Sequence, residues 1–223
     1  MRLWLVRHAQ PDIAAGHCYG STDITADTAA TRDCAAALAA LLPASLAVWT
    51  SPLQRCRQLA DALRSLRPGL EARPDARLAE MHFGAWENRP WCDIAREELD
   101  AWTADFPGYA TGDHGETVAG FMQRVAQAMD DLQAPAQAGR MDRLHPADQT
   151  DTTSAPPGDA GDTLWITHAG VIRAAALIAA GRRSLRQADE WPSEAPGFGQ
   201  WCVLDWHGEV HNHTLQGEQP AAH

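Results

Sequence analysis

Two short apolar runs, each followed by a histidine, constrain the fold of this chain more than any other feature. Residues 3–6 (Leu-Trp-Leu-Val) lead into Arg7-His8-Ala9, and residues 164–166 (Leu-Trp-Ile) lead into Thr167-His168-Ala169-Gly170. Both runs are typical of buried strands, and a turn followed by a helix fits after each. Residues at the carboxyl ends of neighbouring strands in an open α/β sheet converge on one crevice. We therefore expect the two histidines to face one ligand.

Strand-like and helix-like segments alternate along the chain. Besides the two runs above, the patterns predict strands at residues 46–50 and 70–73, and a terminal hairpin of residues 200–206 and 209–214. The predicted helices are residues 27–42, 53–66, 90–104, 117–132 and 171–180. Ser51 and Pro52 read as the N-cap and first position of the second helix, and Gly181 as the residue that ends the last. This alternation predicts an α/β fold of three layers (αβα), with a mainly parallel sheet and an antiparallel strand at one edge.

Length and composition indicate one globular domain over residues 1–223. The chain has 223 residues, of which 45% are hydrophobic, enough for a single large α/β core. Residues 134–162 are rich in Pro, Gly, Ala, Asp and Thr and carry almost no apolar side chains. Such a stretch predicts a flexible surface insertion, because loops beyond about 15 residues are uncommon unless they are functional or disordered.

The charge and the cysteines exclude several partners. A net charge of -11 opposes binding to nucleic acid, because polyanions are bound mainly through Lys and Arg. The longest apolar stretch, residues 171–180, is far shorter than the ~20 residues of a membrane span. Five scattered cysteines without a CxxC pair, and the lack of an N-terminal signal pattern, predict a reducing, cytoplasmic compartment.

The residues around the two histidines suggest phosphoryl chemistry. Neutral imidazole can attack phosphorus, so His8 is the candidate nucleophile. All 18 basic residues are Arg, whose planar fork suits bidentate binding of oxyanions. Arg7 adjoins His8, and Arg55 lies one turn into the helix after the second strand. With His168, they are the candidate phosphate ligands, and the N-termini of the helices behind them add backbone donors.

A departing alkoxide needs a proton, and a carboxyl group in a partly closed site can supply one. Glu80 is the candidate acid, because it lies in a glycine-containing loop that leads back from the third strand. Glu87 and Glu116 are rivals for the same role.

These motifs together resemble the histidine phosphatase (phosphoglycerate mutase-like) superfamily. Arg7-His8-Ala9 is similar to its Arg-His-Gly signature, residues 51–55 to the segment with its second arginine, residues 80–87 to its acid-bearing motif, and residues 167–173 to its second-histidine motif. The resemblance covers residues 1 to about 180. It implies that His8 forms a phosphohistidine, that Arg7, Arg55 and His168 hold the phosphoryl group, and that Glu80 donates a proton and then activates water. It implies a small phosphorylated substrate and no metal or organic cofactor.

Within the superfamily, residues 16–20 with Asp23, residues 80–87 and residues 115–117 are most similar to the α-ribazole phosphatases, which dephosphorylate a cobalamin precursor, α-ribazole 5'-phosphate. The chain departs from the family pattern at Ala9 and Ala169, where Gly is usual, and at Asn88, which replaces a common Gly. A methyl group at the first two positions could tighten a turn or crowd a backbone donor.

A phosphoglycerate mutase is the main alternative inside this fold. In the mutase pattern an Arg directly follows the acid, whereas this chain has Met81, and Ala14 stands where mutases commonly have Asn. Both differences favour a monophosphate with an apolar or aromatic leaving group. Tyr19, Met81 and Trp86 are the candidate platform for that group, and Gly20 is a further candidate substrate contact.

Two other classes of function stay open at this point. A catalytically silent phosphate-binding module would explain Ala9 and Ala169, although an anion binder has no use for His8 and Glu80 together. A metal site at His207, His211 and His213 lacks a carboxylate or thiolate partner at a recurring spacing. The sequence leaves the oligomeric state open, with a dimer as one candidate.

Overall fold

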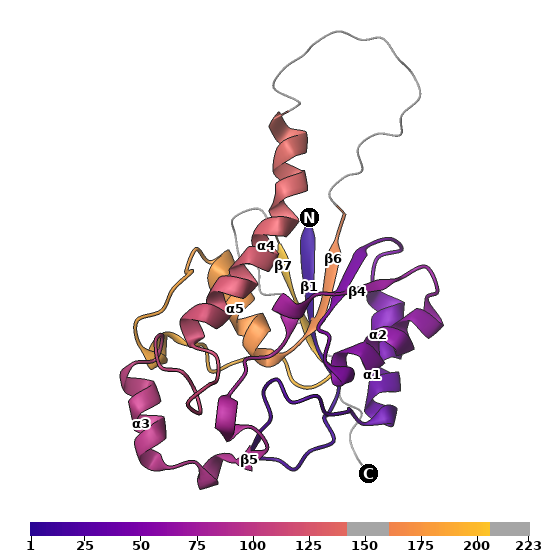
Figure 1. The fold of residues 1–223 in the computed structure, drawn as a ribbon. Coiled ribbons are helices and arrows are strands. Elements are labelled where there is room, and N and C mark those ends of the chain that lie inside the picture. The colour runs from indigo at the N-terminus through magenta and orange to yellow at the C-terminus, as the bar shows by residue number, and fades with distance from the viewer. Residues whose placement is uncertain (142–160, 206–223) are drawn as a thin grey trace, which may run out of the picture.

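A computed structural model describes residues 1–141 and 161–205 and shows a five-stranded sheet between two layers of helices (Figure 1). The sheet order is β4-β3-β6-β1-β7, and a separate two-stranded sheet pairs β2 with β5. The strands are β1 (Arg2–Arg7), β2 (His17–Cys18), β3 (Ala47–Thr50), β4 (Ala72–Pro74), β5 (Arg89–Pro90), β6 (Thr163–Thr167) and β7 (Trp201–Asp205). The helices are α1 (Thr28–Leu41), α2 (Gln54–Leu66), α3 (Arg96–Ala104), α4 (Val118–Met141) and α5 (Ala169–Ala179).

The predicted mixed sheet is confirmed. β1 pairs in parallel with β6, β6 with β3, and β3 with β4, whereas β7 runs antiparallel to β1 at the edge. The register places Arg7 opposite Thr167. The residues that follow these two strands therefore emerge side by side.

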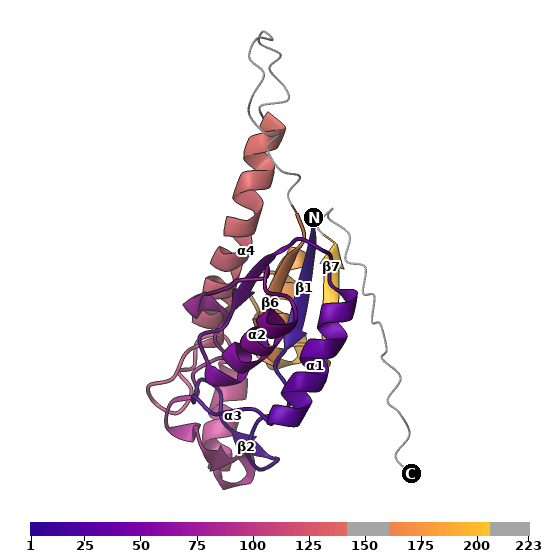
Figure 2. The ribbon, with the colours of Figure 1, turned by 90° about the vertical axis from the view of Figure 1, so that its right-hand side faces the viewer.

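Alternating side chains of β1 divide the core into two layers. Leu3 and Leu5 pack with α4 and α5 on one face, while Trp4 and Val6 pack with α1 and α2 on the other. Figure 2 shows α1 and α2 in front of the sheet, with α4 behind it. Because helices cover both faces of the sheet, a site with polar residues is expected at the carboxyl ends of the strands.

Several predicted boundaries need correction. The helix expected at residues 90–104 begins at Arg96, because Pro90 pairs in β5 and residues 91–93 form a 3₁₀ turn. Helix α4 continues to Met141, so the first part of the predicted insertion at 134–162 is helical. Asp162 accepts two hydrogen bonds from the Arg2 guanidinium at the start of β1. Residues 142–160, the second hairpin strand at 209–214, and the histidine cluster at 207, 211 and 213 lie outside the described residues.

Two helix ends lie close to the predicted positions. Asp27 caps α1 by accepting from the backbone N–H of Ala30. Gly181, at φ 80°, follows the end of α5 in the left-handed conformation that glycine adopts most easily. Among the helices in the two described ranges, none combines the length and apolar composition that a membrane crossing requires.

Candidate active site

The two histidines predicted to meet are neighbours at the carboxyl ends of β1 and β6. Their ring centroids lie 5.1 Å apart at an interplanar angle of 61°, and both side chains are buried. The backbone N–H of His8 donates to the Thr167 carbonyl at 3.0 Å, which extends the strand register by one residue. The parallel pairing of two strands distant in sequence thus builds the centre of the site.

The surroundings of His8 favour one tautomer. Its Nδ1 lies 2.7 Å from the carbonyl oxygen of Ala9. A carbonyl can only accept, so Nδ1 carries the proton and Nε2 keeps its lone pair. Burial, followed by the charge of Arg55, lowers the pKa of His8 to about 3. The imidazole is therefore neutral at physiological pH, as a nucleophile must be.

Arg55 lies in the first turn of α2 and is fully buried against His8. Its Nε donates toward His8 Nε2 at 3.3 Å, while Nη1 and Nη2 donate to the carbonyls of Thr22 and Gly20 at 2.7 and 2.6 Å. Glycine is required at residue 20 for a separate reason, because a Cβ there would lie 2.4 Å from the Met81 carbonyl. Two backbone carbonyls thus orient the guanidinium, whose Nε is the donor nearest to the nucleophile.

The start of α2 differs from the prediction. The helix begins at Gln54 with Leu53 at its N-cap position, whereas Ser51 lies one turn earlier. The Ser51 Oγ accepts from the Leu53 backbone N–H at 3.3 Å and also lies 2.8 Å from His168 Nε2. Asp23 takes over the capping role by accepting from the Gln54 backbone N–H. Ser51 remains in an extended segment, because its N–H donates to the Ile166 carbonyl and prolongs the pairing of β3 with β6. Ser51 is thus a site residue that the sequence pattern had assigned to a helix end.

Arg7 reaches the site from the last position of β1. Its Nη1 donates to the Pro196 carbonyl at 3.0 Å, and its guanidinium carbon lies 3.8 Å from the centroid of the Phe198 ring. Its Nε is buried without a hydrogen-bond partner. An unpaired buried donor is costly unless a ligand satisfies it. The four predicted phosphate-site residues, including Arg7, are therefore gathered at one end of the sheet.

Glu80 is held at the N-terminus of α5, directly beside His168. Its Oε2 accepts from the Gly170 backbone N–H at 3.0 Å, and its Oε1 accepts from the Met81 backbone N–H at 3.1 Å. A Cβ on residue 170 would lie 2.2 Å from Oε1, so glycine is required for this contact. The predicted acid is thus positioned next to the paired histidines.

The two rival carboxylates have structural partners. Glu87 accepts hydrogen bonds from Ser21, Thr22 and the backbone N–H of Phe83. Burial raises the pKa of the Glu87 carboxyl, but these hydrogen bonds outweigh it and hold the pKa below its ordinary value. Glu116 forms an ion pair with Arg124 at 2.7 Å. Neither of these two carboxylates is bound at the N-terminus of α5, where Glu80 lies.

The predicted substrate contacts divide into two groups. Tyr19 and Gly20 adjoin the site, since the Arg55 guanidinium carbon lies 5.1 Å from the Tyr19 ring centroid and Gly20 binds the same guanidinium. Met81 is buried in the main core, although its carbonyl faces Gly20. Trp86 is fully buried among other aromatic rings, and its Nε1 donates to Glu98. The expected Trp86 platform is therefore corrected to a core position.

The three departures from the family pattern fit the observed backbone. Neither Ala9 nor Ala169 has a positive φ, so a methyl group causes no backbone strain at either position. Asn88 has φ 64°, and asparagine tolerates the left-handed region better than most residues with a side chain. These positions therefore keep the local geometry of the site.

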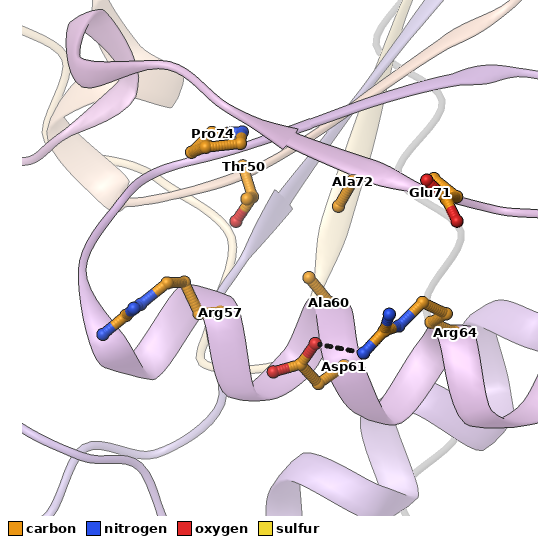
Figure 3. Close-up of a pocket in the computed structure, with 8 residues that line it drawn as sticks. All are labelled: Thr50, Arg57, Ala60, Asp61, Arg64, Glu71, Ala72 and Pro74. Carbon is orange, nitrogen blue, oxygen red and sulfur yellow. Dashed lines mark hydrogen bonds and ion pairs between the residues drawn. The ribbon is translucent and has the colours of Figure 1, made fainter.

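A separate surface pocket of about 180 Å³ lies between α2 and β4 (Figure 3). It is lined by Arg57, Arg64, Asp61 and Glu71, among others, and Arg64 is paired with Asp61. This pocket is lined by side chains of both charges. It therefore does not concentrate positive charge as the site with Arg7 and Arg55 does.

Comparison with known proteins agrees with this geometry. Residues 3–215 match the model of the histidine phosphatase superfamily (branch 1). The chain is 31% identical over 144 residues to an adenosylcobalamin/alpha-ribazole phosphatase of Salmonella typhimurium, a match covering 60% of this chain and 68% of the relative. Among solved structures, TTHB049 from Thermus thermophilus is 26% identical with a TM-score of 0.61, covering 95% of this chain and 97% of that one. A mycobacterial glucosyl-3-phosphoglycerate phosphatase, Rv2419c, shares the fold with a TM-score of 0.71 at 24% identity, covering 96% and 99%.

Proposed function

Because this chain belongs to the histidine phosphatase superfamily, branch 1, and is a phosphoric monoester hydrolase, we propose that it transfers the phosphoryl group of a small ester to His8 and then to water. The observation that carries this proposal is the arrangement of His8 Nε2, the unprotonated ring nitrogen, which accepts from the Arg55 Nε at 3.3 Å and belongs to a ring that lies beside that of His168. A nucleophile with a cationic donor at hydrogen-bonding distance matches the needs of phosphoryl transfer.

The proposed first step is an in-line displacement. His8 Nε2 attacks phosphorus, the N–P bond forms, and the bond from phosphorus to the ester oxygen breaks. Glu80, in its protonated form, gives its proton to the departing oxygen, so the alcohol leaves neutral. Arg55 Nε, Arg7 Nε and His168 stabilise the charge on the equatorial oxygens.

The second step releases phosphate. Water attacks the phosphohistidine, the Glu80 carboxylate accepts its proton, and the N–P bond breaks to return His8 to its starting form. Inorganic phosphate is the product, and Glu80 is again protonated for the next ester. This cycle uses side chains alone, so we propose that it proceeds without a metal ion or organic cofactor.

We propose α-ribazole 5'-phosphate, or another phosphate ester with a nucleoside-like leaving group, as the substrate. The 31% identity to the Salmonella enzyme supports this choice. A phosphoglycerate would need further cations for its carboxylate. In the described part of the chain, Arg7 and Arg55 donate to backbone carbonyls, and Arg173 donates to the carbonyls of Ser193 and Glu194, so each of these guanidinium groups already has protein partners. We also propose, on the sequence alone, that the protein is cytoplasmic.

Two measurements test the proposal together. Phosphate release is measured for α-ribazole 5'-phosphate, p-nitrophenyl phosphate and 3-phosphoglycerate, and acid-labile phosphate on the protein is trapped by rapid quenching. We expect hydrolysis of the first two, a phosphohistidine in the wild-type protein, and at least a roughly 10⁴-fold loss of turnover in His8→Ala. The exposed His114→Ala serves as the matched control. Isomerisation of phosphoglycerate faster than phosphate release, or full turnover in His8→Ala, would overturn the proposal.

A further inference from the structure

The segment before β7 is fixed over the site by two arginines. Arg173 of α5 donates to the carbonyls of Ser193 and Glu194 at 2.8 and 3.3 Å, and Arg7 donates to Pro196 at 3.0 Å. The Gly199 N–H then donates to the His8 carbonyl at 3.0 Å. The chain on either side of residue 198 is therefore tied to residues that build the site.

Phe198 is the side chain that this segment presents at the site. Its ring centroid lies 5.5 Å from that of His8, and one face of the ring covers the Arg7 guanidinium. The side chain is nevertheless 36% exposed. In the part of the chain that the structure describes, the other exposed large apolar side chains are Leu41 and Leu66, at the C-terminal ends of α1 and α2. An exposed aromatic ring beside the nucleophile therefore stands apart from ordinary surface apolar residues.

In the in-line displacement proposed above, the leaving group departs on the side opposite His8 Nε2. The cations nearest the nucleophile, Arg7 and Arg55, have donors held by backbone carbonyls and are covered on a face by Phe198 and Tyr19. A leaving group that contacts Phe198 therefore meets an apolar, aromatic ring. Such rings bind planar aromatic groups by stacking, and bind carboxylates poorly.

We propose that Phe198 is a specificity-determining residue that stacks on an aromatic leaving group of the substrate. This inference rests on the proposed phosphatase function and adds to it the group that selects the ester. Phe198 also packs on Arg7, so a substitution could act through phosphate binding instead. The test must therefore separate contact with the leaving group from support of the arginine.

Binding of non-hydrolysable phosphonates makes that separation without relying on turnover. Dissociation constants for phenylphosphonate and methylphosphonate are measured in the wild type, Phe198→Ala, Phe198→Leu and Phe198→Trp. We expect the wild type to prefer phenylphosphonate, Phe198→Ala to lose about tenfold of that preference, Phe198→Leu to lose part of it, and Phe198→Trp to retain it. Leu66→Ala, which removes an exposed apolar side chain far from the site, should leave both constants unchanged.

The outcomes separate the inference from the function on which it rests. Equal weakening of both phosphonates in Phe198→Ala would show that the ring supports Arg7 alone, and would overturn the inference. The same conclusion follows if the wild type binds both ligands but does not prefer the phenyl compound. Failure of the wild type to bind either phosphonate or to hydrolyse any phosphate ester would instead overturn the proposed function. In Phe198→Ala, a KM that rises more for p-nitrophenyl phosphate than for glycerol 3-phosphate, at unchanged kcat, would support the inference.

Discussion

The floor of the site and its cover are built in different ways. The floor consists of His8, Arg55, His168 and Ser51, which follow strand ends or begin the next helix, and all four are buried. The cover consists of the loop at residues 79–87 and the segment at 193–200, which are held by carboxylates, arginines and aromatic packing. The sheet register brings His8, His168 and Ser51 together, and helix α2 adds Arg55, whereas the cover depends on contacts between loops distant in sequence.

The largest effect expected from this difference concerns the floor arginine. Arg55→Ala removes the donors of two buried carbonyls and the charge beside His8, so kcat/KM should fall about a thousandfold and the free energy of unfolding by about 2–5 kcal/mol. Arg57, two residues along the same helix but exposed, is the matched control. Steady-state kinetics with p-nitrophenyl phosphate and urea unfolding measure the two effects. Similar rates for Arg55→Ala and Arg57→Ala would contradict the account of the floor.

The two carboxylates of the cover should separate chemistry from structure. Glu80→Gln should lower kcat about a hundredfold for an alkyl phosphate, whose oxygen needs a proton, and less for p-nitrophenyl phosphate. Glu87→Gln should keep kcat but lower the free energy of unfolding by about 1–3 kcal/mol, because it loses hydrogen bonds to a buried carboxylate. Kinetics with both esters, together with urea unfolding, decide the matter. The reverse pattern would assign the acid to Glu87.

A smaller effect is expected from pH, and it belongs to the floor. Burial and then Arg55 lower the pKa of both His8 and His168 in the folded protein, whereas an unfolded histidine titrates near pH ~6.5. The unfolded chain therefore binds more protons below about pH 6.5, so stability falls as the pH decreases from there toward the folded-state pKa of His8, about 3. Each histidine contributes at most about 1.4 kcal/mol per pH unit. Urea unfolding at pH 7 and pH 5 should show a smaller decrease in His8→Asn than in the wild type, and an unchanged decrease would contradict this prediction.

Much of the floor could be predicted from the sequence because its signals are local. An apolar run ending in Arg7-His8, and another ending in His168, identify strand ends, and parallel pairing does the rest. Ser51 was misassigned because Ser-Pro before a helical pattern favours an N-cap, whereas the paired backbone continues through it. The competing cap, Asp23, lies in a loop distant in sequence.

The cover was harder to predict for a physical reason. Trp86 looked like a ligand platform because it neighbours the acid-bearing residue, but its apolar area is buried against Trp102 and Tyr109. Phe198 lies in a segment without helical or alternating periodicity, so nothing in the sequence pattern placed it beside His8. Its position depends on hydrogen bonds from Arg7 and Arg173 to backbone carbonyls. Any residue has such a carbonyl, so the identity of the accepting residues does not reveal these contacts.

Arg124 of helix α4 holds the backbone of the loop that carries the candidate acid, Glu80. From α4, its guanidinium binds the carbonyls of Arg77, Ala79 and Glu80 as well as the Glu116 carboxylate. The acid-bearing loop and this helix are therefore connected through one guanidinium group. A chimaera that transplants residues 76–87 into a related scaffold would also need an arginine at the corresponding turn of the helix. Without it, the carbonyls of the transplanted loop would lose the donor that positions them.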